Sequence, residues 1–419
     1  MTGVQTCALP ICSLTVAICS IPEAQSSILA VVHPLPARKE SLPNALNCVL
    51  AEDLVASINV PGWDNSAVDG YAVRAEDVSS AGENNAIHLR VLAEIPAGHP
   101  ATTPLEPRTC MRIFTGAPVP EGADAIVMQE DTRLHHEGYV AVLATVELGE
   151  NIRRVGDDIR VGDVALRSGI LIGPAQLGLA AALGAKELKI VPRPRVGVLV
   201  TGAELVEPGR PLLPGQIYDA NSFALAGYVR QAGGEVVELG IADDTKEDLA
   251  EKIDYALTEC DALVTVGGVS VGEHDLVKAV LADLGCEQNF WRVAMRPGKP
   301  FLFATRGNKL VFGLPGNPVS AAVTFLMLAR PALLKMRGLG DLELPSVEAE
   351  LSEAFVNRGE RTLFVRARRE RLGDKWMLHA LPRQGSHVLT SMAHADCLVE
   401  VKESSTLAAG TKVKALLLP

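Results

Sequence analysis

The spacing of hydrophobic positions predicts helices near the start of the chain. Residues 24–32 and 42–51 carry apolar side chains at helical intervals, and the helix-breaking segment 33–36, His-Pro-Leu-Pro, separates them. We therefore expect two packed helices there. A longer apolar run at 170–185, interrupted by Gly, Pro and Gln, predicts a core helix.

From residue 52 the pattern changes to short β-like runs with frequent Gly and Pro. The predicted strands of this part are residues 88–92, 111–114, 125–128 and 139–144. They indicate a β-rich domain over residues 52–149, which is an ordinary domain size.

Strands and helices alternate after residue 191. The predicted strands are 195–201, 235–239, 262–265 and 310–312, and the predicted helices are 222–232, 246–259, 275–284 and 318–335. Such alternation indicates an α/β domain with a parallel sheet and right-handed crossovers, whose ligands lie at the carboxyl ends of the strands. A second β-like region follows residue 338, with candidate strands at 347–351, 363–369, 377–381 and 413–418.

The length and net charge of the chain limit the number of domains and the kinds of partner that can be expected. The 419 residues exceed what one hydrophobic core usually holds, so we expect several domains. The net charge of −11 argues against nucleic acid as a partner, and an anionic ligand would need a local cluster of cations. Continuous apolar runs stay shorter than the roughly 18 residues of a membrane span, so no membrane association is expected.

The cysteines and the first residues of the chain bear on the cellular compartment in which the protein is expected. Eight cysteines without a Cys-x-x-Cys pair favour a reducing cytoplasm over a disulfide framework or a structural zinc site. Residues 6–21 are uncharged, but the first cation is Arg38, so the positive region of a signal peptide is missing. The opening MTGVQTCALPI resembles a translated sequencing adapter, and we treat residues 1–20 as an artefact or a disordered segment.

A glycine loop at 267–275, GGVSVGEHD, follows a predicted strand and opens a helix. Free backbone N–H groups in such a loop can hold a phosphate, and Asp275 could bind a phosphate-associated Mg²⁺. The alternative is a flexible turn followed by an N-capping Asp. A second loop at 313–320, GLPGNPVS, offers another anion site, although Asn317 and Pro318 also suit ordinary helix initiation.

Between these loops the chain carries three cations in residues 290–300, FWRVAMRPGKP. Arg296 and Lys299 bracket a rigid Pro-Gly turn, a pattern suited to gripping a tetrahedral dianion by charge-assisted hydrogen bonds. A solvated basic edge is the alternative. Earlier in the chain, DNSAVDGYAV at 64–73 places two carboxylates on a turn before a strand, a pattern that an Asx-turn explains in part.

The order of motifs along the chain resembles the molybdopterin molybdenumtransferase family, which includes the E domain of gephyrin. The matching segments are DNSAVDGYAV, RIFTGAPVPEGADAIVMQED, NIRRVGDDI, TGAEL, IYDANS, GGVSVGEHD, MRPGKP and GLPGNPVS. The resemblance extends from about Ser27 to the C-terminus. Two positions depart from it: the family often has Lys at Arg296, where the charge is kept, and Asp at Ala203, where a possible metal or water ligand is lost.

The resemblance implies an elongated multidomain chain that combines α/β and β-rich domains and forms a homodimer. Residues 21–51 and 150–190 would form a helical linker domain, with the β-rich domain 52–149 inserted in it. Residues 191–338 would form the central molybdopterin-binding α/β domain, and residues 339–419 a C-terminal β-barrel-like domain. In the family, the β-rich domain of one subunit faces the α/β domain of the other.

The activity implied by the resemblance is insertion of molybdate into adenylylated molybdopterin, which releases AMP and forms molybdenum cofactor. The implied catalytic residues are Asp69, Asp275 and Lys299. The implied substrate-binding residues are Thr115, Asp158, Gly267, Gly268, Ser270, Gly272, Arg296, Pro315, Ser320, Arg361 and Ser386. Mg²⁺ would be managed by Asp275, with Asp243, Asp244 and Glu204 as further candidate ligands.

Two other functions stay open at this point. A molybdopterin adenylyltransferase shares the α/β domain, but the flanking β-domains of this chain argue against it. A non-catalytic scaffold of the gephyrin type is the second alternative, and the retained Asp69, Asp275 and Lys299 favour an enzyme instead. The implied partners are the upstream adenylyltransferase and the molybdoenzyme apoproteins or their chaperones.

Overall fold

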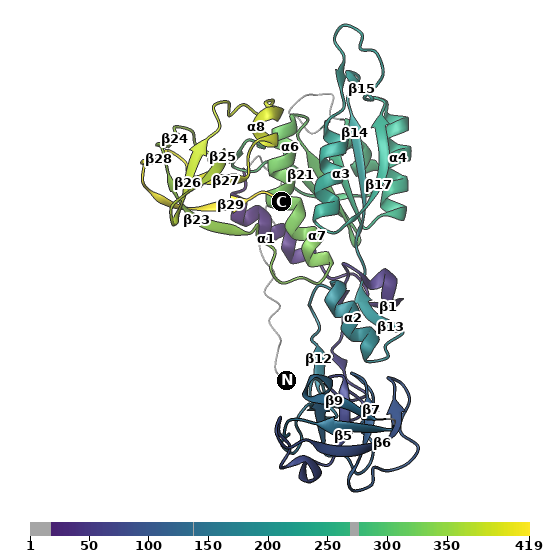
Figure 1. The fold of residues 1–419 in the computed structure, drawn as a ribbon. Helices are drawn as coiled ribbons and strands as arrows, with labels where there is room; N and C mark the ends of the chain where they lie inside the picture. Colours follow the sequence, from purple (N-terminus) through teal and green to yellow (C-terminus); the bar gives the residue numbers. More distant parts are fainter. Residues whose placement is uncertain (1–17, 137, 269–275) are drawn as a thin grey trace, which may run out of the picture. The chain divides into compact units, whose positions relative to one another are not determined.

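A computed structural model describes residues 18–136, 138–268 and 276–419. The chain divides into two compact units (Figure 1). The large unit comprises the chain up to Arg38, together with Asn47–Ala51 and Ile190–Pro419, and the small unit comprises Lys39–Leu46 and Glu52–Lys189. Of the linker domain predicted at 21–51 and 150–190, helix α1 (Ile21–Val31) therefore belongs to the large unit and helix α2 (Pro174–Ala182) to the small unit.

A six-stranded sheet forms the centre of the small unit, in the order β8-β5-β7-β6-β10-β9. The bounds are β5 Gly70–Val73, β6 Ile87–Ile95, β7 Thr109–Ile113, β8 Ala125–Met128, β9 Thr132–His136 and β10 Tyr139–Val142. Side chains alternate across it: Tyr71 and Val73 enter one buried cluster and Ala72 enters another. The four strands predicted in this part are confirmed.

Short elements complete the small unit. Strand β3 (Leu54–Val55) pairs with β12 (Val164–Leu166), and β4 (Asn65–Ser66) pairs with β11 (Ile152–Arg153). The remaining elements are η2 Ala75–Val78, η3 Gln129–Asp131 and helix α2 Pro174–Ala182. The prediction of a core helix at 170–185 is wrong in its burial, because Ala180 is the only buried residue of α2. The apolar composition of a helix alone therefore does not decide whether its residues are buried.

The prediction of a helix at 42–51 is also wrong. The segment forms a 3₁₀ turn, η1 (Leu42–Ala45), followed by strand β2 (Val49–Leu50), which pairs with β13 (Glu187–Val191). Asn47 explains the break, because its φ of 60° lies in the left-handed region that a continuing helix cannot use. Strand β1 (Arg38–Ser41) precedes this turn.

The large unit is built on a six-stranded mixed sheet, in the order β17-β14-β18-β22-β21-β19. The strands are β14 Arg195–Thr201, β17 Glu235–Ala242, β18 Ala262–Val266, β19 Glu287–Trp291, β21 Leu302–Arg306 and β22 Lys309–Leu314. Strands β17, β14, β18 and β22 run parallel, as predicted. The sequence analysis missed β21 and β19, which extend the sheet in antiparallel fashion.

Helices cover both faces of this sheet (Figure 1). Helix α3 (Asn221–Gln231) packs with Val196, Val198 and Val200 of β14 in one buried cluster. Helices α4 (Lys246–Glu259) and α5 (Leu276–Asp283) pack with Leu199 in the other. Alternate side chains of β14 thus point to opposite layers, as expected of a strand buried on both faces.

One long helical segment forms the centre of the larger core. It consists of α6 (Pro318–Thr324), a π-helical turn η4 (Phe325–Ala329) and α7 (Arg330–Met336). Among the described residues, Pro318–Met336 is the one helix long and apolar enough to cross a membrane, and 83% of the apolar window is buried inside the protein. Helix α1 (Ile21–Val31) buries Ile21, Ala24 and Ile28 in the same core.

The expectation that residues 1–20 are an artefact or a disordered segment is wrong for the last two of them. Cys19 forms a β-bridge with Val293, and Ser20 caps α1 in a capping box with Glu23. A helix begins best where a side chain accepts its first free N–H groups, so Ser20 is part of the fold. Residues 1–17 lie outside the described chain.

The predicted C-terminal barrel is confirmed. Strands β25-β26-β23-β29-β27 follow one another, and β25 also pairs with β27, which closes the ring. The bounds are β23 Ser346–Leu351, β25 Thr362–Leu372, β26 Lys375–Ala380, β27 Cys397–Val401 and β29 Lys412–Leu417, with a side pair of β24 Phe355–Asn357 and β28 Ser405–Leu407 and a helix α8 Leu389–Ala393. Strand β20 (Met295–Arg296) pairs with β25, so the basic segment is tied to the barrel.

Candidate active site

A cleft of about 1000 Å³ opens at the carboxyl ends of the parallel strands in the large unit. Its lining follows the ends of β14 and β18 and the β22–α6 loop, with residues including Thr201, Gly202, Glu204, Gly267, Gly268, Gly316 and Asn317. The start of α3 and the small β15–β16 pair (Leu205–Val206 and Ile217–Tyr218) add Asn221 and Tyr218. This position is where an open α/β sheet binds its ligands.

Two glycines of the predicted anion loop line this cleft, and both need to be glycine. Gly267 has φ 89° and Gly268 has φ 62°. A Cβ on Gly267 would lie 2.4 Å from the Thr201 carbonyl oxygen, and a Cβ on Gly268 would lie 2.6 Å from a methyl of Val277. The backbone therefore approaches its neighbours in a way that a side chain would prevent. Ser270, Gly272 and Asp275 lie outside the described residues.

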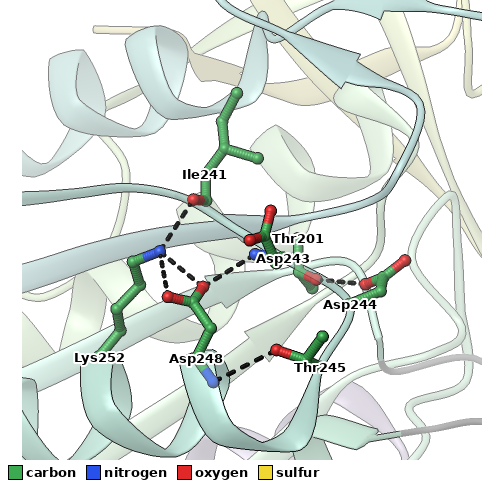
Figure 2. Close-up of polar contacts among 7 residues, drawn as sticks. All are labelled: Thr201, Ile241, Asp243, Asp244, Thr245, Asp248 and Lys252. Atoms are coloured by element: carbon green, nitrogen blue, oxygen red, sulfur yellow. Dashed lines mark hydrogen bonds and ion pairs between the residues drawn. The ribbon is translucent and has the colours of Figure 1, made fainter.

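The structure separates the two neighbouring candidates for metal binding (Figure 2). One Asp244 carboxylate oxygen accepts a hydrogen bond from Thr201 Oγ1 at 2.6 Å, and the other accepts one from the Ala203 N–H at 3.2 Å. These bonds hold Asp244 at the cleft. Among the described residues that line the cleft, Asp244 and Glu204 are the carboxylates, and Asp243 does not take part.

Asp243 instead belongs to the start of helix α4. Its N–H donates to Asp248 Oδ2 at 2.8 Å, and Lys252 Nζ donates to the same oxygen at 2.6 Å. The hydrogen bond from the Lys252 ammonium lowers the pKa of Asp248, which remains a carboxylate. This network caps and orients the helix, so it has a structural role.

The described residues contain no cluster of three His, Cys, Asp or Glu side chains able to enclose a metal ion. Mg²⁺ does not need such a cluster, because it usually binds through one or two carboxylates, waters and substrate phosphates. Asp244 and Glu204 are hard oxygen donors on the wall of a cleft that also carries a glycine turn. This donor set suits a magnesium–phosphate complex.

The loop at 313–320 differs from the predicted anion site. Pro315 is buried and Ser320 is only 5% exposed, and in the described chain the cleft is lined instead by Gly316 and Asn317. The Val319 N–H at the start of α6 donates to the Ser386 carbonyl at 3.1 Å. Ser386 therefore contacts α6 through its backbone carbonyl. The Val319 N–H is already hydrogen-bonded, so it is not available to an anion.

A separate cavity of about 650 Å³ brings the predicted cations together. It is lined by Ile18, Ala294, Arg296, Lys299, Arg358, Gly359, Glu360 and Arg361. Arg361 is oriented by its Nη1, which donates to the Met295 carbonyl at 3.3 Å. Four cations around one acidic residue can attract a compact dianion. Arg358 was missed, because nothing in its local sequence distinguishes it from other surface arginines.

Ser320 and Ser386 are absent from the described lining of this basic cavity, although the family resemblance implies that they bind substrate together with Arg296 and Lys299. Arg292, the third cation of the segment, is also absent from it. Its guanidinium carbon lies 4.2 Å from the ring centre of Trp291, so it stacks on an aromatic face.

The small unit holds a second group of predicted residues. The Thr115 N–H and Oγ1 each donate to one Asp69 oxygen at 2.8 Å. The backbone bond, followed by the hydroxyl bond, lowers the pKa of Asp69 and keeps it ionised. Asp158 is exposed, and within the described chain no hydrogen bond joins its side chain to this pair.

Comparison with known proteins assigns the chain to a family. A model of the MoeA N-terminal region (domain I and II) matches residues 19–184, a probable molybdopterin binding domain matches 197–335, and the MoeA C-terminal region (domain IV) matches 348–418. The molybdopterin molybdenumtransferase of Haemophilus influenzae is 36% identical over 399 residues, covering 94% of this chain and 97% of that protein. The chain belongs to the molybdopterin molybdenumtransferase (MoeA) family.

Other MoeA proteins are similar along their whole length. Molybdopterin molybdenumtransferase 2 of Mycobacterium tuberculosis is 39% identical, covering 94% of this chain and 98% of that protein. The crystal structure of the molybdopterin biosynthesis MoeA protein of Pyrococcus horikoshii has a TM-score of 0.79 and 31% identity, covering 96% of this chain and 99% of that chain. The family predicted from the motifs is thus confirmed.

Proposed function

We propose that the chain inserts molybdenum from molybdate into adenylylated molybdopterin, releasing AMP. The observation that carries this proposal is the presence in the large unit of two unlike cavities. One is a glycine-lined cleft at the sheet edge, and the other is a basic cavity around Arg296, Lys299 and Arg361. The names of the relatives, molybdopterin molybdenumtransferase, support the same activity.

Each cavity suits one substrate. The cleft offers the backbone of Gly267 and Gly268, two carboxylates and the Asn221 amide, a mixture suited to a phosphate-bearing heterocycle with a bound cation. The basic cavity offers cations without a metal-binding cluster, which suits the tetrahedral molybdate dianion.

Asp244 and Glu204 would hold Mg²⁺ at the cleft, and Asp275, which lies outside the described residues, is the further ligand that the family resemblance implies. The bound cation would offset the charge of the substrate phosphates. The chain's own residues then bind and orient. Asp244 is held by Thr201 at 2.6 Å, and the backbone of Gly267 and Gly268 lines the cleft, with the Gly267 N–H donating to the Leu314 carbonyl at 3.2 Å. In the small unit, Thr115 orients the ionised Asp69 carboxylate, and we propose that these two residues contact the substrate.

The alternatives are weaker. The family models cover the N-terminal and C-terminal regions as well as the molybdopterin-binding domain, which disfavours a single-domain adenylyltransferase. We further propose that the chain works as a homodimer in the cytoplasm, between the adenylyltransferase and the molybdoenzyme apoproteins or their chaperones.

One reconstitution experiment tests the activity. Purified protein is mixed with molybdate, Mg²⁺ and adenylylated molybdopterin, and the release of AMP is followed together with activation of an apo-molybdoenzyme. We expect both products to depend on molybdate. An activity that consumes ATP and unmodified molybdopterin would favour the adenylyltransferase, and binding without turnover would favour the scaffold.

A further inference from the structure

The cleft receives one segment from the C-terminal part of the large unit. His387 and Leu389 line it, whereas the other described lining residues belong to the α/β part of the fold. Residues 384–389 comprise the end of the connection from barrel strand β26 and the first residue of helix α8. The sequence analysis singled out Ser386 in this segment and passed over its neighbour His387.

Hydrogen bonds fix the segment from two sides. Gln384 Nε2 donates to the Arg366 carbonyl at 2.8 Å, and the Arg366 N–H donates back to Gln384 Oε1 at 3.0 Å. On the other side, the Val319 N–H of α6 donates to the Ser386 carbonyl at 3.1 Å. The position of His387 is therefore set from the barrel and from the α/β core together.

Arg366 adds a buried cation to this support. Its side chain is 0% exposed, and its guanidinium donates to the Gly385 carbonyl at 3.2 Å and to Ser391 Oγ at 3.3 Å. Burial lowers the pKa of Arg366 to about 10, so the group stays charged at neutral pH. A buried charge is retained only where hydrogen bonds satisfy it, so breaking the 384–389 segment away would be costly.

The imidazole lies beside a glycine. A Cβ on Gly385 would lie 2.9 Å from His387 Cε1 and 3.2 Å from Nδ1. These distances are too short for an unshifted contact, so the ring occupies the space that a side chain at position 385 would take. Gly385 thus allows the orientation that His387 has at the cleft.

The charges lining the cleft make His387 distinctive. Among the described lining residues the carboxylates are Glu204 and Asp244, and His387 is the one side chain that can carry a positive charge. The nearby helix N–H of Val319 is already bound to Ser386. Among the described lining residues, His387 is therefore the cationic hydrogen-bond donor that this cleft offers to a phosphate.

We propose that His387 binds a phosphate of the adenylylated substrate, and of the AMP product, through a charge-assisted hydrogen bond. The proposal rests on the proposed function, since it assumes that the cleft takes a nucleotide-bearing pterin. Arg366, Gln384 and Gly385 act through His387 as positioning residues.

The test measures binding of AMP, and of adenosine as its uncharged counterpart, to the full chain by calorimetry. We expect His387→Ala and His387→Gln to weaken AMP binding about tenfold, the usual size of one lost charge-assisted bond, and to leave adenosine binding unchanged. His387→Lys should restore AMP binding. Gly385→Ala should weaken it with the imidazole still present. His379→Ala is the matched control, because His379 is an exposed barrel imidazole paired with Glu370.

The outcomes separate the two proposals. Circular dichroism and thermal unfolding first establish that each variant is folded. If the wild-type chain releases AMP in the reconstitution but its AMP affinity is immeasurable, or equals that of His387→Ala, the role of His387 is wrong and the proposed function stands. Full affinity in His387→Gln would overturn the cationic role. If the wild-type chain neither binds nor releases AMP, the proposed function itself is wrong.

Discussion

Thr115 donates two hydrogen bonds to the same oxygen of Asp69, one from its N–H and one from its hydroxyl, each 2.8 Å long. A carboxylate held in this way is oriented before any ligand arrives, and it stays ionised because both bonds favour the charged form.

We expect Asp69→Asn to lower AMP release about 100-fold, and Thr115→Val, which removes only the hydroxyl bond, to lower it about tenfold. The lowered pKa also predicts a pH effect. The stabilisation is present above the unfolded value of 3.8 and is lost as the pH falls through the lower folded value. Urea unfolding between about pH 5 and pH 3 should therefore show a steeper acid loss for wild type than for Asp69→Asn. Equal slopes would contradict the assignment.

The basic cavity predicts a charge-dependent affinity for molybdate. Arg296→Ala and Lys299→Ala should each weaken molybdate binding about tenfold, and the remaining affinity should fall with added salt. Arg296→Lys should bind nearly as wild type, because the charge is kept. Arg292→Ala is the control, since its guanidinium stacks on Trp291. Calorimetry with molybdate measures all four, and an unchanged affinity in Lys299→Ala would remove that residue from the site.

The N-terminus predicts a difference between two truncations. Removing residues 1–17 should leave the free energy of unfolding unaltered, because the opening MTGVQTCALPI of this segment resembles a translated adapter. Removing residues 1–20 should lower it by about 1–2 kcal/mol, because the Ser20 cap and the Cys19 bridge are lost. Ser20→Ala should reproduce about half of that loss. Denaturant titration compares the three proteins, and equal stability of both truncations would show that the cap is unimportant.

Asp244 and Asp243 are adjacent in sequence, but the structure assigns them different roles. Asp244→Asn should raise the Mg²⁺ concentration needed for half-maximal AMP release about tenfold, since Asn still accepts the Thr201 bond but carries no charge. Asp243→Asn should leave it unchanged. A Mg²⁺ titration of AMP release distinguishes them, and identical shifts in both variants would show that the effect comes from overall charge.

The family resemblance predicts that two chains contribute to each active site. A heterodimer of Asp69→Asn and Asp275→Asn chains would then contain one intact site and one doubly altered site. It should recover about half of the wild-type rate of AMP release if the sites are independent. Differently tagged chains are co-expressed, and the heterodimer is purified. Activity no higher than that of the mutant homodimers would mean that one chain supplies both residues.

Local signals account for the elements that were predicted well. Helix α4 is confirmed at both ends, and its start is explained by the Thr245 cap and the acidic residues of its first turn. The same rules failed at 42–51, where the apolar spacing is helical but Asn47 takes a left-handed conformation. Periodicity reports which face can be buried, and it does not report where the backbone turns.

The sequence by itself determined the family, the parallel strands β14, β17, β18 and β22 and the glycine turn at 267–268, because these depend on local spacing and on residues that no other side chain can replace. The tertiary structure decided which predicted residues meet. It placed Arg296, Lys299 and Arg361 in one cavity with Arg358, separated Asp244 from Asp243, and used the Val319 N–H to hold Ser386. Such assignments depend on contacts between residues far apart in the chain, which no local pattern encodes.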